Sequence, residues 1–140
     1  MLADLIDWYQ TLSPGSVSRA AVFYAPDARF IDPFNDVRGV KAIEGIFLAM
    51  FEELDAPRFK VVECCRGEAS AMLRWQMNFR RQDVAFEIQG VSCIGFDPNG
   101  QVCRHEDYWD PAKALFMGIP LLGWVLRKLY SRLSATVKSL

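Results

Sequence analysis

The clearest chemical signal in the chain is a histidine and an aspartate two residues apart. Residues 101–110 have the alternation of a strand, so His105, Asp107 and Trp109 share one face. The opposite face of that strand carries Arg104, Glu106 and Tyr108. At a rise of about 3.3 Å per residue, His105 and Asp107 lie about 7 Å apart along the strand, and both are residue types that can act in general acid–base chemistry. Structural roles stay open, with His105 in a satisfied hydrogen bond and Asp107 in an ion pair with Arg74 or Arg104.

The cysteines do not indicate a metal site. The four cysteines are Cys64, Cys65, Cys93 and Cys103, and no two have the C-x-x-C spacing. A single histidine cannot complete a familiar zinc finger. We therefore expect reduced, buried thiols on strands of a cytoplasmic protein, with no metal.

Length and composition fit one folded domain. The chain has 140 residues, 51% hydrophobic and 24% charged, which excludes intrinsic disorder. No apolar run reaches the roughly 20 residues of a transmembrane helix, and the N-terminus lacks a signal-peptide pattern. With a formal net charge of −1, the total does not favour nucleic acid as a partner.

Apolar periodicity predicts helices first and strands afterwards. Helical spacing predicts short helices over 3–12 and up to about Tyr24, then a four-turn helix over 40–54 whose apolar stripe includes Phe47 and Phe51. Alternation predicts a brief strand over 28–32, and four long strands over 58–66, 70–80, 84–97 and 101–110. The turn Pro98-Asn99-Gly100 predicts a hairpin. This order is typical of an α+β fold in one domain.

One segment resembles a known family. The residues FYAPDARFIDP, Phe23 to Pro33, precede Gly39 at the start of a helix. This order resembles the nuclear transport factor 2-like superfamily, in its ketosteroid isomerase and SnoaL-like polyketide cyclase branch. The resemblance covers residues 3–110 and implies a strongly curved antiparallel sheet around N-terminal helices, a cone-shaped barrel with an apolar pocket. We expect a SnoaL-like domain at 1–110 and a helical extension at 111–140.

The resemblance also implies roles for individual residues. The general base of the isomerases corresponds to Asp32, which can instead cap the turn that follows its strand. Their two oxyanion donors correspond to Trp8, with Tyr9 next along the chain, and to Ser92. Because both donors differ here, steroid isomerisation is not expected. A carboxylate at Asp107 resembles the catalytic acid/base of polyketide cyclases.

The same match turns the His105 face toward the pocket. It implies Asp32 as the base, with His105 and Asp107 as partner acid and orienter. The expected pocket lining is Trp8, Tyr9, Phe47, Phe51, Trp75, Met77, Phe86, Ser92 and Trp109. Such a pocket suits a small hydrophobic molecule, with cofactor-free isomerase, dehydratase or cyclase chemistry. The motifs specify the fold better than the reaction, so a non-catalytic protein that binds a hydrophobic ligand or lipid stays open.

Two kinds of partner are expected besides the small molecule. Superfamily members commonly pair through the outer face of the sheet, which implies a homodimer. All 17 acidic residues lie within 1–110, where the net charge is −6, while the last thirty residues carry +5. There an apolar stripe from Leu122 to Val137 lies opposite basic residues, and this pattern predicts peripheral membrane contact by residues 118–140. The stripe can instead pack on the protein's own body or on a dimer mate.

Overall fold

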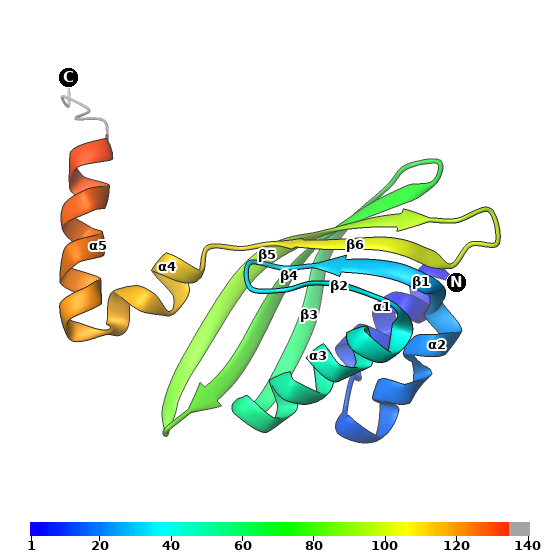
Figure 1. Cartoon of the computed structure of the whole chain (residues 1–140), viewed down its shortest axis with the longest axis horizontal. Helices are drawn as coiled ribbons and strands as arrows, with labels where there is room; N and C mark the ends of the chain where they lie inside the picture. The colour runs from blue at the N-terminus through cyan, green and yellow to red at the C-terminus, as the bar shows by residue number, and fades with distance from the viewer. Residues whose placement is uncertain (135–140) are drawn as a thin grey trace. The chain divides into compact units, whose positions relative to one another are not determined.

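The structure is a computed structural model that describes residues 1–134 (Figure 1). The chain forms two compact units, Met1–Trp109 and a second that begins at Asp110. The first unit contains α1 (Leu2–Gln10), η1 (Pro14–Arg19), α2 (Ala20–Phe23), β1 (Tyr24–Ile31), β2 (Asp36–Arg38), α3 (Val40–Glu53), β3 (Asp55–Arg66), β4 (Ser70–Arg81), β5 (Val84–Phe96) and β6 (Val102–Tyr108). The α+β prediction and the four long strands are therefore confirmed. Within the described residues, no helix has the length and apolar character needed to cross a membrane.

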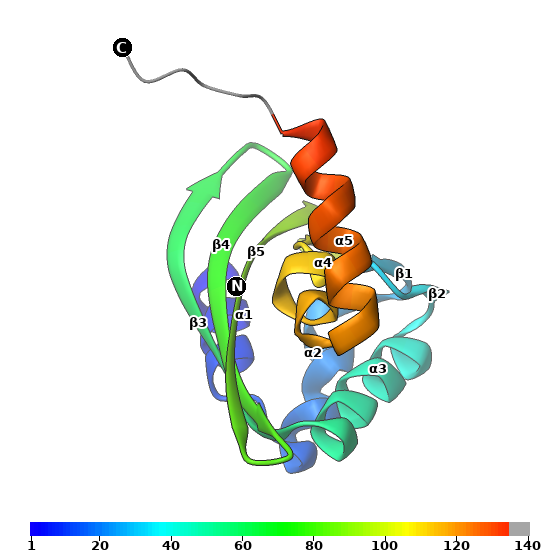
Figure 2. The same cartoon turned by 90° about the vertical axis from the view of Figure 1, so that its left-hand side faces the viewer.

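The six strands form one strongly curved sheet in the order β2-β1-β6-β5-β4-β3. All neighbours are antiparallel except β1 and β6, which run parallel. The sheet curves around α1 and α3 (Figures 1 and 2), and both helices contact β3. Helices thus occupy the space between the edge strands β2 and β3, and among the described residues these edges do not pair. The expected barrel is therefore wrong in one respect, because the sheet stays open.

The concave face of the sheet forms the core. Along β4 the burial alternates strictly, with Leu73, Trp75 and Met77 buried and Arg74 exposed. From the other side, α1 contributes Leu5 and Trp8 to the same core. This is the period of two expected when one face of a sheet is covered by helices.

Two turns show why the strands pair as they do. Gln82 and Asp83 connect β4 to β5 with φ of 49° and 63°, the left-handed values of a two-residue hairpin loop. Gly100 has a φ of 80°, where a side chain would be strained, which confirms the predicted Pro98-Asn99-Gly100 turn.

Three local expectations need correction. The strand expected over 28–32 begins earlier, at Tyr24, directly after the second helix ends at Phe23. The short β2 was not expected, because three residues carry too little alternation to be recognised. The cysteines lie on strands as free thiols, but Cys64, Cys65 and Cys103 are exposed instead of buried. Thiols are small and weakly polar, so an exposed strand position tolerates them as readily as a core position.

The second unit consists of α4 (Pro111–Ala114), η2 (Phe116–Gly118) and α5 (Pro120–Leu133). Arg127 donates to the carbonyl of Met117 at 2.9 Å, which ties η2 to one side of α5. Much of the apolar stripe of α5 is exposed, including Leu122, Val125 and Leu129. Val137 and Lys138, which belong to the predicted stripe and its basic face, lie outside the described residues.

Candidate functional site

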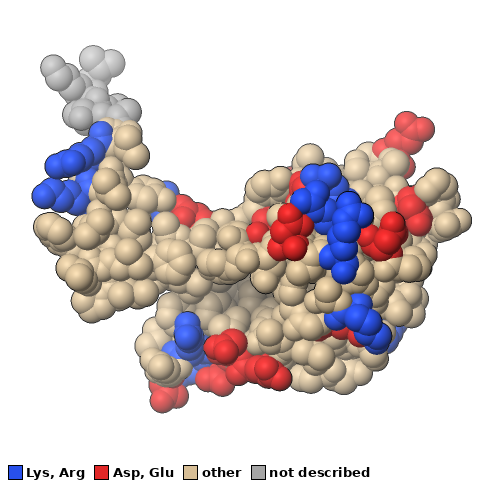
Figure 3. Space-filling view, in the orientation of Figure 1, with Lys and Arg blue, Asp and Glu red and all other residues tan. Residues whose placement is uncertain are grey.

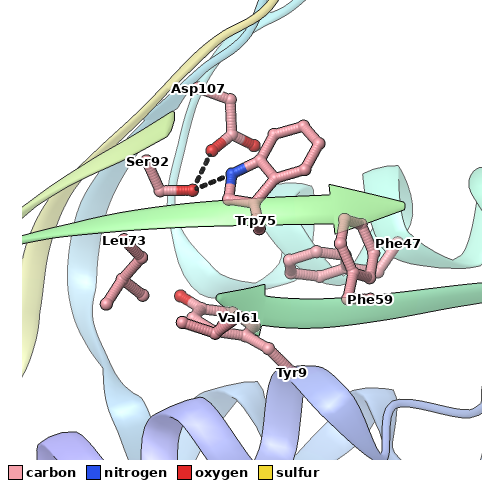
Figure 4. A pocket seen from close by; sticks show the side chains of 8 residues that line it. All are labelled: Tyr9, Phe47, Phe59, Val61, Leu73, Trp75, Ser92 and Asp107. Carbon is pink, nitrogen blue, oxygen red and sulfur yellow. Dashed lines mark hydrogen bonds between the residues drawn. The ribbon is translucent and has the colours of Figure 1, made fainter. Parts of the chain in front are cut away.

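A small pocket opens on the concave side of the sheet (Figure 4). Its cavity volume is about 30 Å³, room for about two water molecules, since one water needs about 10–15 Å³. Six elements contribute its lining, which consists of Tyr9, Phe47, Phe59, Val61, Leu73, Trp75, Ser92 and Asp107. Most of this wall is apolar, and Asp107 is its one carboxylate.

The two carboxylate oxygens of Asp107 have different surroundings. Oδ1 accepts hydrogen bonds from Nε2 of His105 at 2.8 Å and from the hydroxyl of Ser92. Ser92 in turn accepts a hydrogen bond from the indole N–H of Trp75 at 2.9 Å (Figure 4). Oδ2 has no hydrogen-bond partner among the described residues. One oxygen is thus fixed by two donors, and the other is left to accept a proton or a hydrogen bond.

The imidazole of His105 is buried behind Asp107. A carboxylate can only accept, so Nε2 of His105 carries the proton of its hydrogen bond to Asp107, and in this neutral tautomer Nδ1 is an acceptor. The hydroxyl of Tyr24 lies 2.6 Å from Nδ1 and donates to it in this tautomer. The hydroxyl of Tyr9 lies 2.8 Å from that of Tyr24 and 3.2 Å from Nδ1. The ring of Phe30, 4.7 Å away, packs on the imidazole.

Both tyrosines are held in their neutral form. Burial raises the pKa of Tyr9 far above its ordinary value of 10.0, and the negative charge of Asp107 raises it further. The pKa of Tyr24 is also raised, first by burial, then by its contact with Tyr9, and last by the charge of Asp107. At neutral pH the two hydroxyls therefore act as hydrogen-bond donors and acceptors, not as phenolates.

Asp32 makes its hydrogen bonds within the turn that follows β1, not with this cluster. Its Oδ1 accepts from the backbone N–H groups of Phe34 and Asn35, at 2.7 and 2.8 Å. The side-chain amide of Asn35 donates to both carboxylate oxygens, at 3.0 and 2.9 Å. Asp32 does not line the pocket and makes no hydrogen bond to His105 or Asp107. The structure brings His105 and Asp107 together, and it uses Asp32 to cap the turn after β1.

The alternative ion pairs of Asp107 are also not formed. Arg74 pairs with Glu63 at 3.0 Å on the outer face of the sheet. Arg104 pairs with Glu106 on the same face. Asp107 instead faces inward with His105, as the alternation of β6 predicts.

The expected lining is met in part. Tyr9, Phe47, Trp75 and Ser92 line the cavity. Five others do not, namely Trp8, Phe51, Met77, Phe86 and Trp109. Trp8 is buried in the core and donates its N–H to the carbonyl of Ser16 at 3.0 Å. One position along a helix is a rotation of about 100°, so Tyr9, not Trp8, reaches the pocket.

The remaining members of that set have other contacts. Phe51 packs against the core, and Met77 is buried on the concave face. The ring of Phe86 stacks on Phe79 at 5.2 Å, near the hairpin end of β4 and β5. The ring of Trp109 meets Phe34 at 5.6 Å, beside the turn after β1.

Sequence reasoning missed four residues of the site. Phe59, Val61 and Leu73 line the cavity, and their alternation within 58–66 and 70–80 places them on the inward face with Trp75. Tyr24 lies within the FYAPDARFIDP segment, but the resemblance assigned it no role. A metal centre is not indicated in the described part of the chain, which holds no cluster of three potential ligands.

Comparisons with known proteins agree with the fold. A family model for the SnoaL-like domain matches residues 5–105. A protein of ketosteroid isomerase-like fold from Catenulispora acidiphila, solved with trimethylamine, aligns with a TM-score of 0.70 at 11% identity, over 81% of this chain and 88% of its own. A protein from Jannaschia sp. CCS1, assigned as a SnoaL-like polyketide cyclase, aligns with a TM-score of 0.70 at 14% identity, over 80% and 84%.

Two further relatives differ in what they cover. A LEH-like epoxide hydrolase of M. tuberculosis aligns with a TM-score of 0.66 at 13% identity, over 90% of this chain and 92% of its own. The mitochondrial ketol-acid reductoisomerase of Saccharomyces cerevisiae is 30% identical over 104 residues, which is 71% of this chain. The chain spans only 26% of the length of that enzyme.

Proposed function

Because the chain belongs to the SnoaL-like domain family, we propose that its pocket binds a small hydrophobic molecule and that Asp107 acts on it as a cofactor-free general base or acid. We base this on one observation. Asp107 faces an apolar cavity with Oδ1 fixed by His105 and Ser92, while Oδ2 has no partner among the described residues.

The apolar lining supports a hydrophobic occupant. Aromatic and aliphatic side chains surround the carboxylate, and the polar groups within reach of a bound molecule are Asp107, Ser92 and Tyr9. Because the cavity holds only about two waters, binding requires side chains such as Phe59 or Trp75 to move outward.

The reaction class that fits is proton transfer in an isomerase, dehydratase or cyclase type of reaction. One carboxylate can remove a proton from carbon, and one neutral phenol can exchange a proton with the oxygen of the resulting enolate. An epoxide-opening reaction with an Asp-Arg-Asp arrangement fits less well, because Arg74 pairs with Glu63 on the outer face.

Hydrogen–deuterium exchange tests the proposal directly. The protein is incubated in D₂O with a panel of small cyclic ketones and enones, and loss of the α-proton signal is followed by NMR. Asp107→Asn should slow the catalysed exchange about 10²–10⁴-fold, the usual contribution of a general base. Two matched controls, Asp32→Asn and Glu106→Gln, change a turn carboxylate and an outward neighbour on β6, and both should leave the rate unchanged. Equal rates for Asp107→Asn and wild type would overturn the assignment.

A second candidate function is ligand binding without turnover, for a hydrophobic molecule or a lipid. It is favoured by the mutual satisfaction of the polar groups, since Trp75 donates to Ser92, Ser92 to Asp107, and His105 bonds at both nitrogens. Thermal shifts with ketones, enones and lipids distinguish the two functions. Stabilisation by a compound that shows no proton exchange supports binding alone.

In that second function we also propose that the C-terminal unit touches an anionic membrane. The stripe of α5 that includes Leu122, Val125 and Leu129 is exposed, and Lys128 lies 5.1 Å from the exposed ring of Trp124. On the face seen in Figure 3, the basic groups of α5 have no acidic groups beside them. Apolar and basic surfaces on one helix suit the boundary between acyl chains and headgroups.

A further inference from the structure

A continuous chain of hydrogen bonds leaves the pocket at one residue and returns to it at another. Tyr9 and Asp107 both line the cavity, whereas Tyr24 and His105 lie behind its wall. The links are Tyr9 to Tyr24 at 2.8 Å, Tyr24 to Nδ1 of His105 at 2.6 Å, and Nε2 of His105 to Asp107 at 2.8 Å. The two ends of the cavity are therefore joined through the interior of the protein.

We propose that these four residues form a proton relay between the Tyr9 end and the Asp107 end of the pocket, and that the substrate is an enolisable ketone or its enol. This inference rests on the proposed function of Asp107. Tyr24 and His105 would be positioning residues, since neither lines the cavity, and Tyr9 would be the second group to touch the substrate.

The resting hydrogen positions define the direction of transfer. Nε2 of His105 donates to Asp107, so Tyr24 donates to Nδ1 and Tyr9 donates to Tyr24. Tyr9 thus presents a lone pair to the cavity. A substrate hydroxyl that gives its proton to Tyr9 shifts the proton of Tyr9 to Tyr24, that of Tyr24 to Nδ1, and that of Nε2 to Oδ1 of Asp107.

This shift conserves atoms and charge. One proton leaves the enol, which becomes an enolate, and the Asp107 carboxylate becomes a carboxylic acid. His105 and both tyrosines begin and end neutral. Once the carboxyl group turns to present this proton to the cavity, Asp107 protonates the enolate at carbon, which gives the ketone and restores the carboxylate. The proton of His105 is then on Nδ1, and the reverse sequence returns it to Nε2. The reverse sequence converts ketone to enol.

Burial favours such a concerted shift over separate ionisations. The exposed fractions of Tyr24, His105 and Tyr9 are 1%, 3% and 8%, so water has little access to the chain of donors. The raised pKa values of both tyrosines disfavour a phenolate at either position. Tyr9, Tyr24 and Asp107 are the titratable groups that bond to His105 among the described residues, and no basic side chain joins them.

Two rates measured on one probe separate the relay from the base. The probe is 2-acetylcyclohexanone, a neutral diketone whose enol absorbs in the ultraviolet. Exchange of its carbon-bound proton requires Asp107, whereas ketonisation of its enol also requires the hydroxyl proton to reach Asp107. The amide of His105→Gln can still donate to Asp107 but cannot pass a proton through. We expect this variant to lose about 10²-fold or more of the ketonisation rate and a much smaller part of the exchange rate.

Two further measurements guard against a variant that only disturbs the fold. Tyr24→Phe removes one hydroxyl and leaves the 3.2 Å contact between Tyr9 and Nδ1, so ketonisation should fall less than in His105→Gln. Wild-type ketonisation in H₂O–D₂O mixtures should show a curved dependence on deuterium content, because several protons move together, and His105→Gln should show a linear one. Since His105 is the single histidine of the chain, ¹⁵N NMR also reports its tautomer without ambiguity, and we expect the proton on Nε2.

The outcomes separate two failures. If Asp107→Asn abolishes exchange while His105→Gln changes neither rate, the relay is wrong and the proposed function stands. If Asp107→Asn changes neither rate, the proposed function fails. A resting proton on Nδ1 instead of Nε2 also overturns the relay, because Tyr24 could not then donate to that nitrogen.

Discussion

Gly90 on β5 is the position where one added methyl group should do the most damage to the site. A Cβ there would lie 2.5 and 2.6 Å from two ring carbons of Trp75 and 2.9 Å from the carbonyl oxygen of Tyr108. Carbon atoms pack at about 3.5–4.0 Å, so the indole must shift by about 1 Å. That shift lengthens its 2.9 Å hydrogen bond to Ser92 beyond bonding range.

The expected cost follows from these two effects. Overpacking of this kind costs about 1–3 kcal/mol, and the lost hydrogen bond adds about 1 kcal/mol. Replacing glycine by alanine recovers about 0.4–1 kcal/mol through the unfolded chain. Gly90→Ala should therefore lower the free energy of unfolding by about 2 kcal/mol. At about 4 °C per kcal/mol for a domain of this size, Tm should fall by about 8 °C.

Gly95 provides a matched control on the same strand. A Cβ at Gly95 meets the Cβ of Arg104 at 3.5 Å, an ordinary contact on the outer face. Gly95→Ala should leave Tm unchanged or raise it slightly, since only the effect on the unfolded chain remains. Both variants are compared by circular-dichroism melting and by urea titration. Equal melting of Gly90→Ala and wild type, or an equal loss in both variants, would refute the packing described for Trp75.

Three other predictions concern pH, assembly and membranes. The raised pKa values of Tyr9 and Tyr24 mean that the folded chain holds these protons more tightly than the unfolded chain, so stability is unaffected below about pH 10 and falls above it. A wild-type Tm that does not decline in alkaline melts contradicts this, as does an equally steep decline in a variant with both Tyr9→Phe and Tyr24→Phe. The exposed Tyr108 on the outer face should lie in a homodimer interface. Sedimentation of the wild type should therefore give twice the 15.9 kDa monomer mass, and Tyr108→Lys should give the monomer. A monomeric wild type at micromolar concentration excludes the dimer. Wild type should pellet with anionic liposomes at low salt, and reversing the charges of Lys128 and Arg132 should release it. An intact protein that never pellets with them excludes the proposed membrane contact.

The sequence predicted the strands correctly where the alternation of apolar and polar residues was long. The strands 70–80 and 84–97 have several cycles of alternation each, and the structure places them within one or two residues of their predicted ends. β2 was missed because Asp36–Arg38 becomes a strand through pairing with β1, not through its own pattern. Pairing partners far apart in sequence leave no local signal.

The site was predictable only in part, for local reasons. Alternation along β6 placed His105 and Asp107 on the inward face. The role of Asp32 depended on whether its carboxylate reaches a pocket or its own turn, and the amides of Phe34 and Asn35 are close enough to hold it. Sequence alone cannot weigh these two outcomes, because both use the same carboxylate after the same strand.

The tyrosines show a second limit. An ungapped match assigned the oxyanion-donor position to Trp8, although the helix turns Tyr9 toward the cavity and Trp8 into the core. An error of one residue is harmless for a helix assignment, yet it replaces one side chain of the site by another. Tyr24 became part of the site only through β1 pairing with β6, which no local pattern indicates.

The parallel pairing of β1 with β6 also sets the order in which the chain can mature during translation. The β4–β5 hairpin closes through a two-residue loop and can form as soon as β5 leaves the ribosome. The contact between Phe30 and His105 closes a long loop, and it can form only after His105 has been synthesised. The entropy cost of closing this loop therefore falls late in folding. Helix α1 is synthesised first, yet β1 and β5 keep unpaired edges until β6 emerges between them. A nascent chain stalled before Val102 would therefore expose those strand edges to chaperones and to other chains.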